Sequence, residues 1–307
     1  MLKKMSINKK ILILLVLSLL IPLTSATSIF SDDFESGTLS GWSLSSASGA
    51  NNWTNSLTDP FQGSRHAQSQ PQSTTEPASV IERTIITSGY QDINFSYKRK
   101  LVELDGVDEF QAEWFDGTSW AILEQTGGAA ANDVSYIPQS FNLPSTANNN
   151  PNFRIKFECT AGAVSEFCRV DNIDINGILI DTTPPLITLN SPLNNQFINI
   201  NNVKFNITLN ENGSSAKYTL NNWAANITLS TTNNLTFNHT NNSIADGTYT
   251  AKFYANDTAG NINNTLTSTF TIDTTIPLIS IIQPQNISYN TIQTQLNYSI
   301  SDTNLQA

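Results

Sequence analysis

The chain has 307 residues, 25 acidic against 15 basic side chains and a formal net charge of −10. This acidic balance disfavours nucleic acids and anionic membrane surfaces as partners. The sequence carries only two histidines and no Gly-x-Ser-x-Gly, His-Glu-x-x-His or phosphate-binding-loop motif. We therefore expect no enzymatic activity in this segment.

Residues 1–26 are typical of a secretory signal peptide. Four lysines precede an apolar run at residues 11–20, and the small residues at 24–26 fit a cleavage site. The alternative is an uncleaved membrane anchor, but the apolar run is short against the roughly 20 residues that a span needs. Since no second stretch approaches that length, we expect a secreted or cell-surface protein with no membrane span in this segment.

Residues 27–180 alternate apolar and polar side chains in several stretches, among them Ile93–Tyr97 and Phe110–Trp114. This period of two is typical of strands with one face on a core and one in water. Asp116-Gly117 predicts a hairpin, because glycine and aspartate tolerate a positive φ. No stretch shows a sustained helical period, so the sequence predicts an all-β fold with one sandwich in this block.

Cys159 and Cys168 are the only cysteines of the chain. In an exported protein, a close and even pair predicts a disulfide. The alternative is a pair of reduced core cysteines. A zinc site needs more ligands, and no histidine lies nearby in the sequence.

A repeat dominates the second half of the chain. Residues 181–189 return as residues 273–281, an offset of 92 (273 − 181). A period near 90 fits an immunoglobulin-like sandwich, so we expect one complete repeat at 181–272. Residues 273–307 hold only the truncated start of the next repeat, with room for about two strands, which cannot bury a core alone. We expect this tail not to fold independently and the chain to be the front part of a longer protein.

The first block resembles a known group of modules at its two ends. It opens with Asp-Asp-Phe-Glu at 32–35 and Gly-Trp at 41–42, and it closes with Val-Asp-Asn-Ile-Asp-Ile at 170–175. This pattern is similar to the jelly-roll modules related to MAM domains and to carbohydrate-binding modules. The MAM cysteine pattern is absent. The resemblance implies a jelly-roll β-sandwich at 27–180 that binds a ligand.

The repeat at 181–272 resembles the Ig-like repeats of bacterial and archaeal surface proteins. The motifs are Asp-Thr-Thr-Pro-Pro at 181–185 and Asp-Thr-Ala-Gly-Asn at 257–261, a turn before the last strand. The resemblance implies an Ig-like β-sandwich, which is an architecture and not a chemistry.

The jelly-roll resemblance also implies a structural calcium ion between the opening segment and the last strand. Asp33, Glu35 and Asp171 match the family positions, with Gly63 and Ser64 as possible carbonyl donors. Calcium takes six to eight oxygen ligands of this kind. The alternative is a set of turn-capping aspartates in an acidic loop.

Glycan binding needs exposed aromatic platforms. Among the five tryptophans, Trp53 lies in an asparagine-rich stretch at 51–55 and is the best candidate for an exposed ligand contact. We expect Trp42 and Trp114 to pack in the core.

Sequons for asparagine-linked glycosylation are dense. Ten lie between residues 182 and 307, against about six expected from random placement of Asn, Ser and Thr there. The candidate sites are Asn52, Asn94, Asn206, Asn212, Asn226, Asn234, Asn238, Asn241, Asn256, Asn263, Asn286 and Asn297.

Together these features predict a secreted or cell-surface adhesion or ligand-binding protein. The jelly roll would be a recognition head for an extracellular glycan or protein, and the Ig-like repeats would form its stalk. One rival is a set of accessory modules of an exported hydrolase whose catalytic domain lies beyond this segment. The other is a structural surface-layer component.

Overall fold

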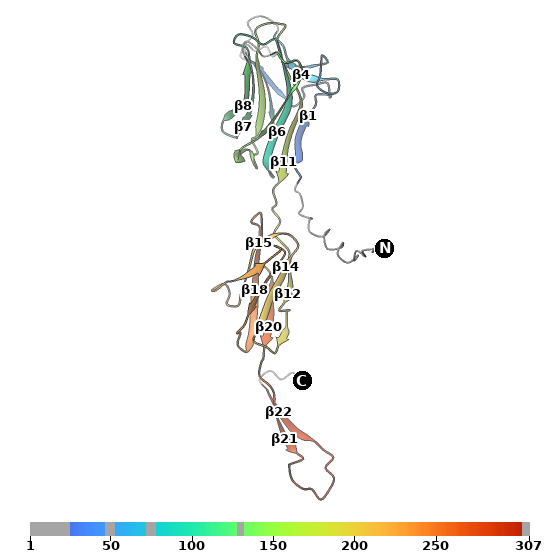
Figure 1. The fold of residues 1–307 in the computed structure, drawn as a ribbon, viewed down its shortest axis with the longest axis vertical. Coiled ribbons are helices and arrows are strands. Elements are labelled where there is room, and N and C mark those ends of the chain that lie inside the picture. Colours follow the sequence, from blue (N-terminus) through green and yellow to red (C-terminus); the bar gives the residue numbers. More distant parts are fainter. Residues whose placement is uncertain (1–24, 47–52, 72–77, 128–131, 303–307) are drawn as a thin grey trace, which may run out of the picture. The chain divides into compact units, whose positions relative to one another are not determined.

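The computed structural model describes residues 25–46, 53–71, 78–127 and 132–302. The chain divides into two compact units, Met1–Ile180 and Asp181–Ala307 (Figure 1). Apart from one 3₁₀ turn, η1 (Ser145–Ala147), every regular element in the described part is a β-strand, so the all-β prediction is confirmed. The same part contains no helix long and apolar enough to cross a membrane. Most of the expected signal peptide and Asn52 lie outside the described residues.

The first unit contains two antiparallel sheets, A and B. Sheet A has the order β3-β4-β11-β6-β9, with β1 also paired to β11, and sheet B has the order β2-β5-β10-β7-β8. The strands of sheet A are β1 (Thr27–Asp32), β3 (Trp53–Ser56), β4 (His66–Ser69), β6 (Tyr90–Val102), β9 (Ile137–Asn142) and β11 (Phe167–Leu179). Those of sheet B are β2 (Ser43–Ser46), β5 (Ser79–Thr84), β7 (Glu109–Phe115), β8 (Trp120–Gly127) and β10 (Arg154–Thr160).

Aromatic side chains fill the space between the two sheets. Phe95 and Tyr97 of β6 meet Phe157 of β10 at ring-centroid distances of 5.9 and 4.9 Å. All three are buried, as are Trp42 and Trp114, which the sequence placed in the core. Burial of such large rings is the main stabilising contribution to a sandwich of this size.

Strand β11 organises sheet A, because it pairs with β6 along its length and with both β4 and β1 on its other edge (Figure 1). Its pairing with β6 shifts register between Asp171 and Asp174, where Asn172 has a φ of 51°. A bulge of this kind turns neighbouring side chains out of the regular alternation. It lies beside the candidate site described below.

The predicted disulfide is confirmed. Cys159 at the end of β10 and Cys168 in β11 are bonded, with their Cα atoms 6.0 Å apart. The bond therefore joins sheet B to sheet A across the short connection between their strands.

In the second unit, one nine-stranded sheet folds over into a sandwich. The order is β12-β14-β17-β16-β15-β18-β20-β13, with β19 paired to β18. The rings of Phe205 in β14 and Tyr218 in β15 stack at 3.8 Å although their strands are not neighbours, so the sheet closes over a common core. The strands are β12 (Ile187–Ser191), β13 (Gln196–Ile198), β14 (Val203–Leu209), β15 (Gly213–Thr219), β16 (Ile227–Thr231), β17 (Thr236–Asn241), β18 (Gly247–Asp257), β19 (Ile262–Asn263) and β20 (Thr267–Ile272).

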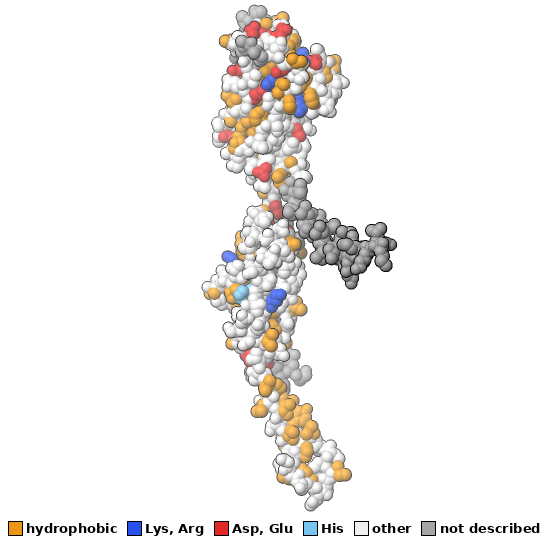
Figure 2. Space-filling view, viewed as in Figure 1, with side chains coloured by type: hydrophobic (Ala, Val, Ile, Leu, Met, Phe, Trp, Pro, Cys, Tyr) orange, Lys and Arg blue, Asp and Glu red, His pale blue; other side chains and the backbone are white. Residues whose placement is uncertain are grey.

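A two-stranded hairpin follows, formed by β21 (Leu278–Gln283) and β22 (Asn297–Ser301). Strand β21 corresponds to β12 at the 92-residue offset, and both strands begin a repeat. Ile187 is 8% exposed whereas its counterpart Ile279 is 59% exposed. Hydrophobic side chains accordingly show on the surface of this hairpin (Figure 2). Within the described residues the hairpin has no facing sheet of its own.

Replacing both cysteines by serine should lower the free energy of unfolding of the first unit by roughly 2.5–3 kcal/mol, because the bond closes a loop of about ten residues in the unfolded chain. Chemical denaturation of the double variant and the parent chain, followed by near-ultraviolet circular dichroism, measures the difference. Equal midpoints for the two proteins would contradict the prediction. A Ser88→Ala variant, at an exposed position of the first unit, serves as the control.

Candidate functional site

The outer side of sheet A, turned away from the core, carries a group of polar and aromatic side chains. Ala67 and Val170 point into the core, so their neighbours His66, Gln68 and Arg169 point outward. A loop between β3 and β4 and the segment before β9 cover part of this side. We call the group the polar face; its residues are Ser31, Asp59, Phe61, His66, Gln68, Ser96, Lys98, Lys100, Tyr136, Arg169, Asp171, Asn172 and Asp174.

Asp59 is the centre of the covered part of the polar face. Its carboxylate accepts hydrogen bonds from Lys100 Nζ at 2.8 Å and from Arg169 Nη1 at 2.7 Å. The hydrogen bond from Lys100 is the largest influence holding its pKa below the usual range. Tyr136 Oη donates to the Asp59 carbonyl oxygen at 3.1 Å, which links the segment before β9 to the same loop.

Asp171 holds the loop between β3 and β4 against the sheet. Its Oδ2 accepts the backbone N–H of Phe61 at 2.9 Å and of Gln62 at 3.3 Å, and its Oδ1 accepts that of Asn172 at 2.7 Å. The side chain has no exposed surface, and burial raises its pKa to about 6. Backbone N–H groups therefore offset part of the cost of burying this carboxylate.

Glu35 holds the same loop further along. Its Oε1 accepts the backbone N–H of Ser64 and of Arg65, each at 2.7 Å. Gly63 has a φ of 69°, and a Cβ there would lie 2.5 Å from Glu35 Oε1. Only glycine fits this position without displacing the carboxylate.

His66 is buried beneath the loop. Its Nε2 lies 3.4 Å from Gln68 Oε1, which also accepts a hydrogen bond from Arg169 Nε at 2.9 Å. Burial lowers the pKa of His66 to about 4, so the imidazole is neutral at physiological pH. Its Nδ1 has no partner in the described part of the chain. This histidine is a packed, buried group of the polar face.

The open part of the polar face is a cavity of about 220 Å³ between β1, β6 and β11. Hydroxyl, amine, amide and carboxylate groups line it, from Ser31, Ser96, Lys98, Asn172 and Asp174. Lys98 Nζ lies 5.3 Å from the centre of the Phe61 ring, which is 43% exposed. The aromatic ring and the polar cavity are thus neighbours.

The prediction that Trp53 is an exposed ligand contact is wrong. The side chain is 2% exposed, and its indole N–H donates to the Ser79 carbonyl oxygen at 3.0 Å. Its asparagine-rich setting suggested a loop, but Trp53 begins β3 and packs into the core. The residues that do form the polar face, such as Phe61 and Tyr136, lie in loops that no local pattern singles out.

The three carboxylates expected to hold calcium do not converge. Asp33 is exposed and accepts the Glu35 backbone N–H at 3.2 Å, while Glu35 and Asp171 accept N–H groups of the covering loop. Two groups of three acidic side chains in the described residues bring oxygens within 4.8 Å of one another, and neither includes these residues. Calcium binding at these residues therefore stays a prediction.

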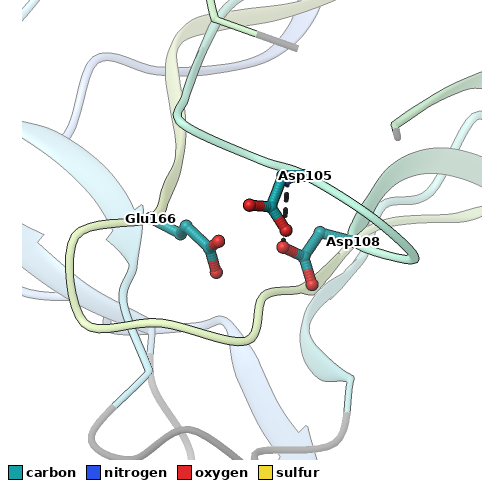
Figure 3. Close-up of side chains that lie close together, drawn as sticks. All are labelled: Asp105, Asp108 and Glu166. Carbon is teal, nitrogen blue, oxygen red and sulfur yellow. Dashed lines mark hydrogen bonds between the residues drawn. The ribbon is translucent and has the colours of Figure 1, made fainter. Parts of the chain in front are cut away.

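One of the two acidic groups lies in the first unit, where Asp105, Asp108 and Glu166 come together (Figure 3). Asp108 and Glu166 are buried, and Glu166 Oε2 accepts the backbone N–H of Gly162 and Ala163. No lysine or arginine of the described residues forms an ion pair with Asp108 or Glu166. Burial, together with the hydrogen bond to Asp108, raises the pKa of Glu166.

The other acidic group, in the second unit, consists of Asp181, Glu211 and Asp257. Burial and the two neighbouring carboxylates raise the pKa of Glu211. Asp257 instead accepts both the backbone and side-chain N–H groups of Asn261, each at 2.8 Å, within the Asp-Thr-Ala-Gly-Asn turn. Asp257 therefore stabilises this turn through its hydrogen bonds with Asn261.

The eleven sequon asparagines within the described residues are all at least partly exposed. Several already make side-chain hydrogen bonds; Asn94, for example, donates to Ser140 and Asn142. Their use as glycosylation sites stays a prediction.

Comparison with known proteins supports the architecture. A family model described as a bacterial Ig-like domain matches residues 190–274, in agreement with the Ig-like resemblance of this repeat. No curated protein sequence matches the chain.

Several solved structures are similar to about half of the chain. The carbohydrate-binding module TmCBM61 in complex with β-1,4-galactotriose is 9% identical, with a TM-score of 0.39 over 48% of this chain and 97% of that chain. The CBM22-1 xylan-binding domain of Paenibacillus barcinonensis Xyn10C is 13% identical, with a TM-score of 0.36 over 51% and 98%. The K3 cleaved adhesin domain of Lys-gingipain from Porphyromonas gingivalis is 14% identical, with a TM-score of 0.37 over 50% and 99%. Scores in this range carry no argument about ligands, so the proposals below depend on the geometry of this chain.

Asp171→Asn should destabilise the first unit by about 1–3 kcal/mol, because the new amide NH₂ must face a backbone N–H that has lost its acceptor. Asp33→Asn is the matched control, and its effect should stay within about 0.5 kcal/mol because its carboxylate is exposed. Urea unfolding of both variants at pH 7.5 measures the difference. Equal stability of the two variants would show that Asp171 does not anchor the loop.

A raised pKa of Glu166 means that the folded state favours its protonated form. The contribution of Glu166 to the free energy of unfolding should therefore be fully present below its unfolded-state pKa and should be lost as the pH rises through its folded-state pKa. Glu166→Gln keeps an oxygen for the two N–H donors and should flatten this fall, whereas the exposed Glu103→Gln should not. Thermal unfolding between pH 4 and pH 8 tests this, and parallel curves for parent and Glu166→Gln would refute it.

Proposed function

We propose that the first unit binds saccharides at the polar face of sheet A. The observation that carries the proposal is the 220 Å³ cavity, which is lined by charged and neutral hydrogen-bonding groups. One of these groups, the Lys98 amine, lies 5.3 Å from the ring of the exposed Phe61. Sugars present hydroxyl groups around the rim of the ring and C–H groups on its faces. A site that combines polar groups with an aromatic surface matches both features.

The residues that line the cavity offer different groups to a saccharide. Ser31, Ser96 and Asn172 offer neutral donors and acceptors, while Asp174 and Lys98 offer a carboxylate and an ammonium group. The oxygens of Asp174 already accept hydrogen bonds from Ser28 at 2.8 Å and Asn176 at 2.9 Å, which fixes the orientation of this carboxylate. An oriented acceptor loses less conformational entropy on binding than a free one.

The wider role follows from the module order. We propose a secreted or cell-surface protein in which the first unit is the recognition head, without catalytic activity in this segment, and the Ig-like repeat is a spacer. A glycan is the partner that the polar face favours, ahead of a protein ligand. The same saccharide-binding head would also suit an accessory module of an exported hydrolase. A purely structural surface-layer component, in contrast, would not need to bind a saccharide.

Lys98→Ala tests the site. Isothermal titration calorimetry of the whole chain with cellotetraose, xylotetraose, mannotetraose and galactotriose should find at least one ligand, and Lys98→Ala should weaken its binding at least tenfold, about 1.4 kcal/mol. Lys204→Ala removes an exposed lysine of the second unit and should leave the affinity unchanged.

Two results would count against the proposal. The first is saccharide binding that Lys98→Ala and Lys204→Ala leave equally intact, which would place the site elsewhere. The second is an absence of binding across soluble oligosaccharides and insoluble polysaccharides alike, which would favour the structural surface-layer alternative.

A further inference from the structure

The second unit has its own cavity, of about 340 Å³, on the outer side of the strands β15 and β18. Two aromatic rings, one amine and two amides line it, from Lys217, Trp223, Asn226, Tyr254 and Asn264. Lys217 and Tyr254 are directly opposite each other in the pairing of β15 with β18. Their neighbours along the strands, Ala216 and Phe253, are buried in the core, so this pair points outward.

The turn that carries Trp223 is held by hydrogen bonds and not by packing alone. The buried hydroxyl of Thr219 accepts the backbone N–H of Asn221 at 3.2 Å and of Trp223 at 3.1 Å. Asn221 Oδ1 in turn accepts the backbone N–H of Ala225 at 2.8 Å. The neighbouring residue Asn222 accepts a hydrogen bond from Lys252 Nζ through its Oδ1, at 2.7 Å.

The backbone of Trp223 itself has a φ of 70°, and that of Asn222 a φ of 54°. Asparagine tolerates this left-handed region, but for a bulky residue such as tryptophan it is a genuine outlier. Strained residues persist where the surrounding structure over-determines them, and they cluster at ligand sites. The hydrogen bonds of the turn hold the Trp223 backbone in this conformation, and the side chain lines the cavity.

The polar groups of the cavity are unused within the described part of the chain. There, no hydrogen bond involves the indole N–H of Trp223, the hydroxyl of Tyr254 or the side-chain amides of Asn226 and Asn264, and no carboxylate pairs with Lys217. Lys217 Nζ lies only near the Tyr254 ring, 5.9 Å from its centre. Five hydrogen-bonding groups thus converge on one space together with two aromatic rings.

We propose that this cavity is a second saccharide site, located in the Ig-like unit. A pyranose ring packs on the aromatic side chains, and its hydroxyl groups bond to the Lys217 amine, the Asn264 amide and the indole N–H. The site lies in the second unit and uses no residue of the polar face. This proposal can therefore be tested separately from the function proposed for the first unit.

The saccharide has two possible sources with the same chemistry. It can be free in solution, or it can be the first sugar of a glycan attached to Asn226, which begins the sequon Asn226-Ile227-Thr228. Asn226 is exposed and lies on the wall of the cavity, three residues after Trp223. A sugar attached there would start within reach of the ring.

The test for a free saccharide uses the whole chain, produced in a host without asparagine-linked glycosylation. The Lys98→Ala variant serves as the background, because it weakens the binding proposed for the first unit. Calorimetric titration with cellotetraose, xylotetraose, mannotetraose and N,N′-diacetylchitobiose should still detect binding. Adding Trp223→Ala or Tyr254→Ala should weaken it at least tenfold, whereas adding Lys204→Ala should not. Two separate aromatic variants guard against a change that affects folding of the turn.

The test for an attached glycan uses chain from a glycosylating host, with occupancy of Asn226 measured by mass spectrometry. Blocking attachment with Asn226→Gln should lower the melting temperature of the second unit when Trp223 is present and not in Trp223→Ala. Binding or stabilisation that depends on Trp223 in either arm supports the proposal. Two results would overturn the proposal. One is saccharide binding whose affinity neither Trp223→Ala nor Tyr254→Ala changes, and the other is the absence of any effect that depends on Trp223 in both experiments.

Discussion

The candidate site depends on one buried carboxylate. Asp171 has no exposed surface and no lysine or arginine among its hydrogen-bond partners. Three backbone N–H groups donate hydrogen bonds to its carboxylate. Two of these N–H groups belong to the loop that carries Asp59 and Phe61. Because an unpaired buried carboxylate is costly, the loop can leave the sheet only by exposing or protonating Asp171. The hydrogen bonds to this one buried side chain therefore hold in place a loop that has no regular secondary structure.

The same loop connects the covered and open parts of the polar face. On the covered side, Asp59 forms ion pairs with both Lys100 and Arg169. On the open side, Phe61 lies against Lys98, whose amine forms no ion pair within the described residues. The loop thus leaves one lysine available for a ligand and places an aromatic ring beside it, which is the combination that the proposed saccharide site needs.

Much of the architecture was predictable from the sequence, because period-two alternation, the 92-residue repeat and an even cysteine pair each reflect local or covalent constraints. The sites were not. Trp53 follows a polar stretch and was expected to be exposed, but it begins a core strand. Asp171 and Glu35 were expected to bind a cation, yet their partners are N–H groups of a loop about 110 and 30 residues away in sequence. Trp223 takes a left-handed backbone that propensity disfavours. Such long-range pairings leave no periodic signal.

Amide hydrogen exchange at Phe61 and Gln62 tests the central claim most directly. Both amides lie outside any strand and would exchange rapidly in a free loop, but a hydrogen bond to a buried carboxylate should protect them strongly. The account predicts slow exchange of both amides in the parent chain and in Asp33→Asn, and faster exchange of both in Asp171→Asn, with strand amides of sheet B unaffected. Rapid exchange of Phe61 and Gln62 in the parent chain at pH 7.5 would contradict it.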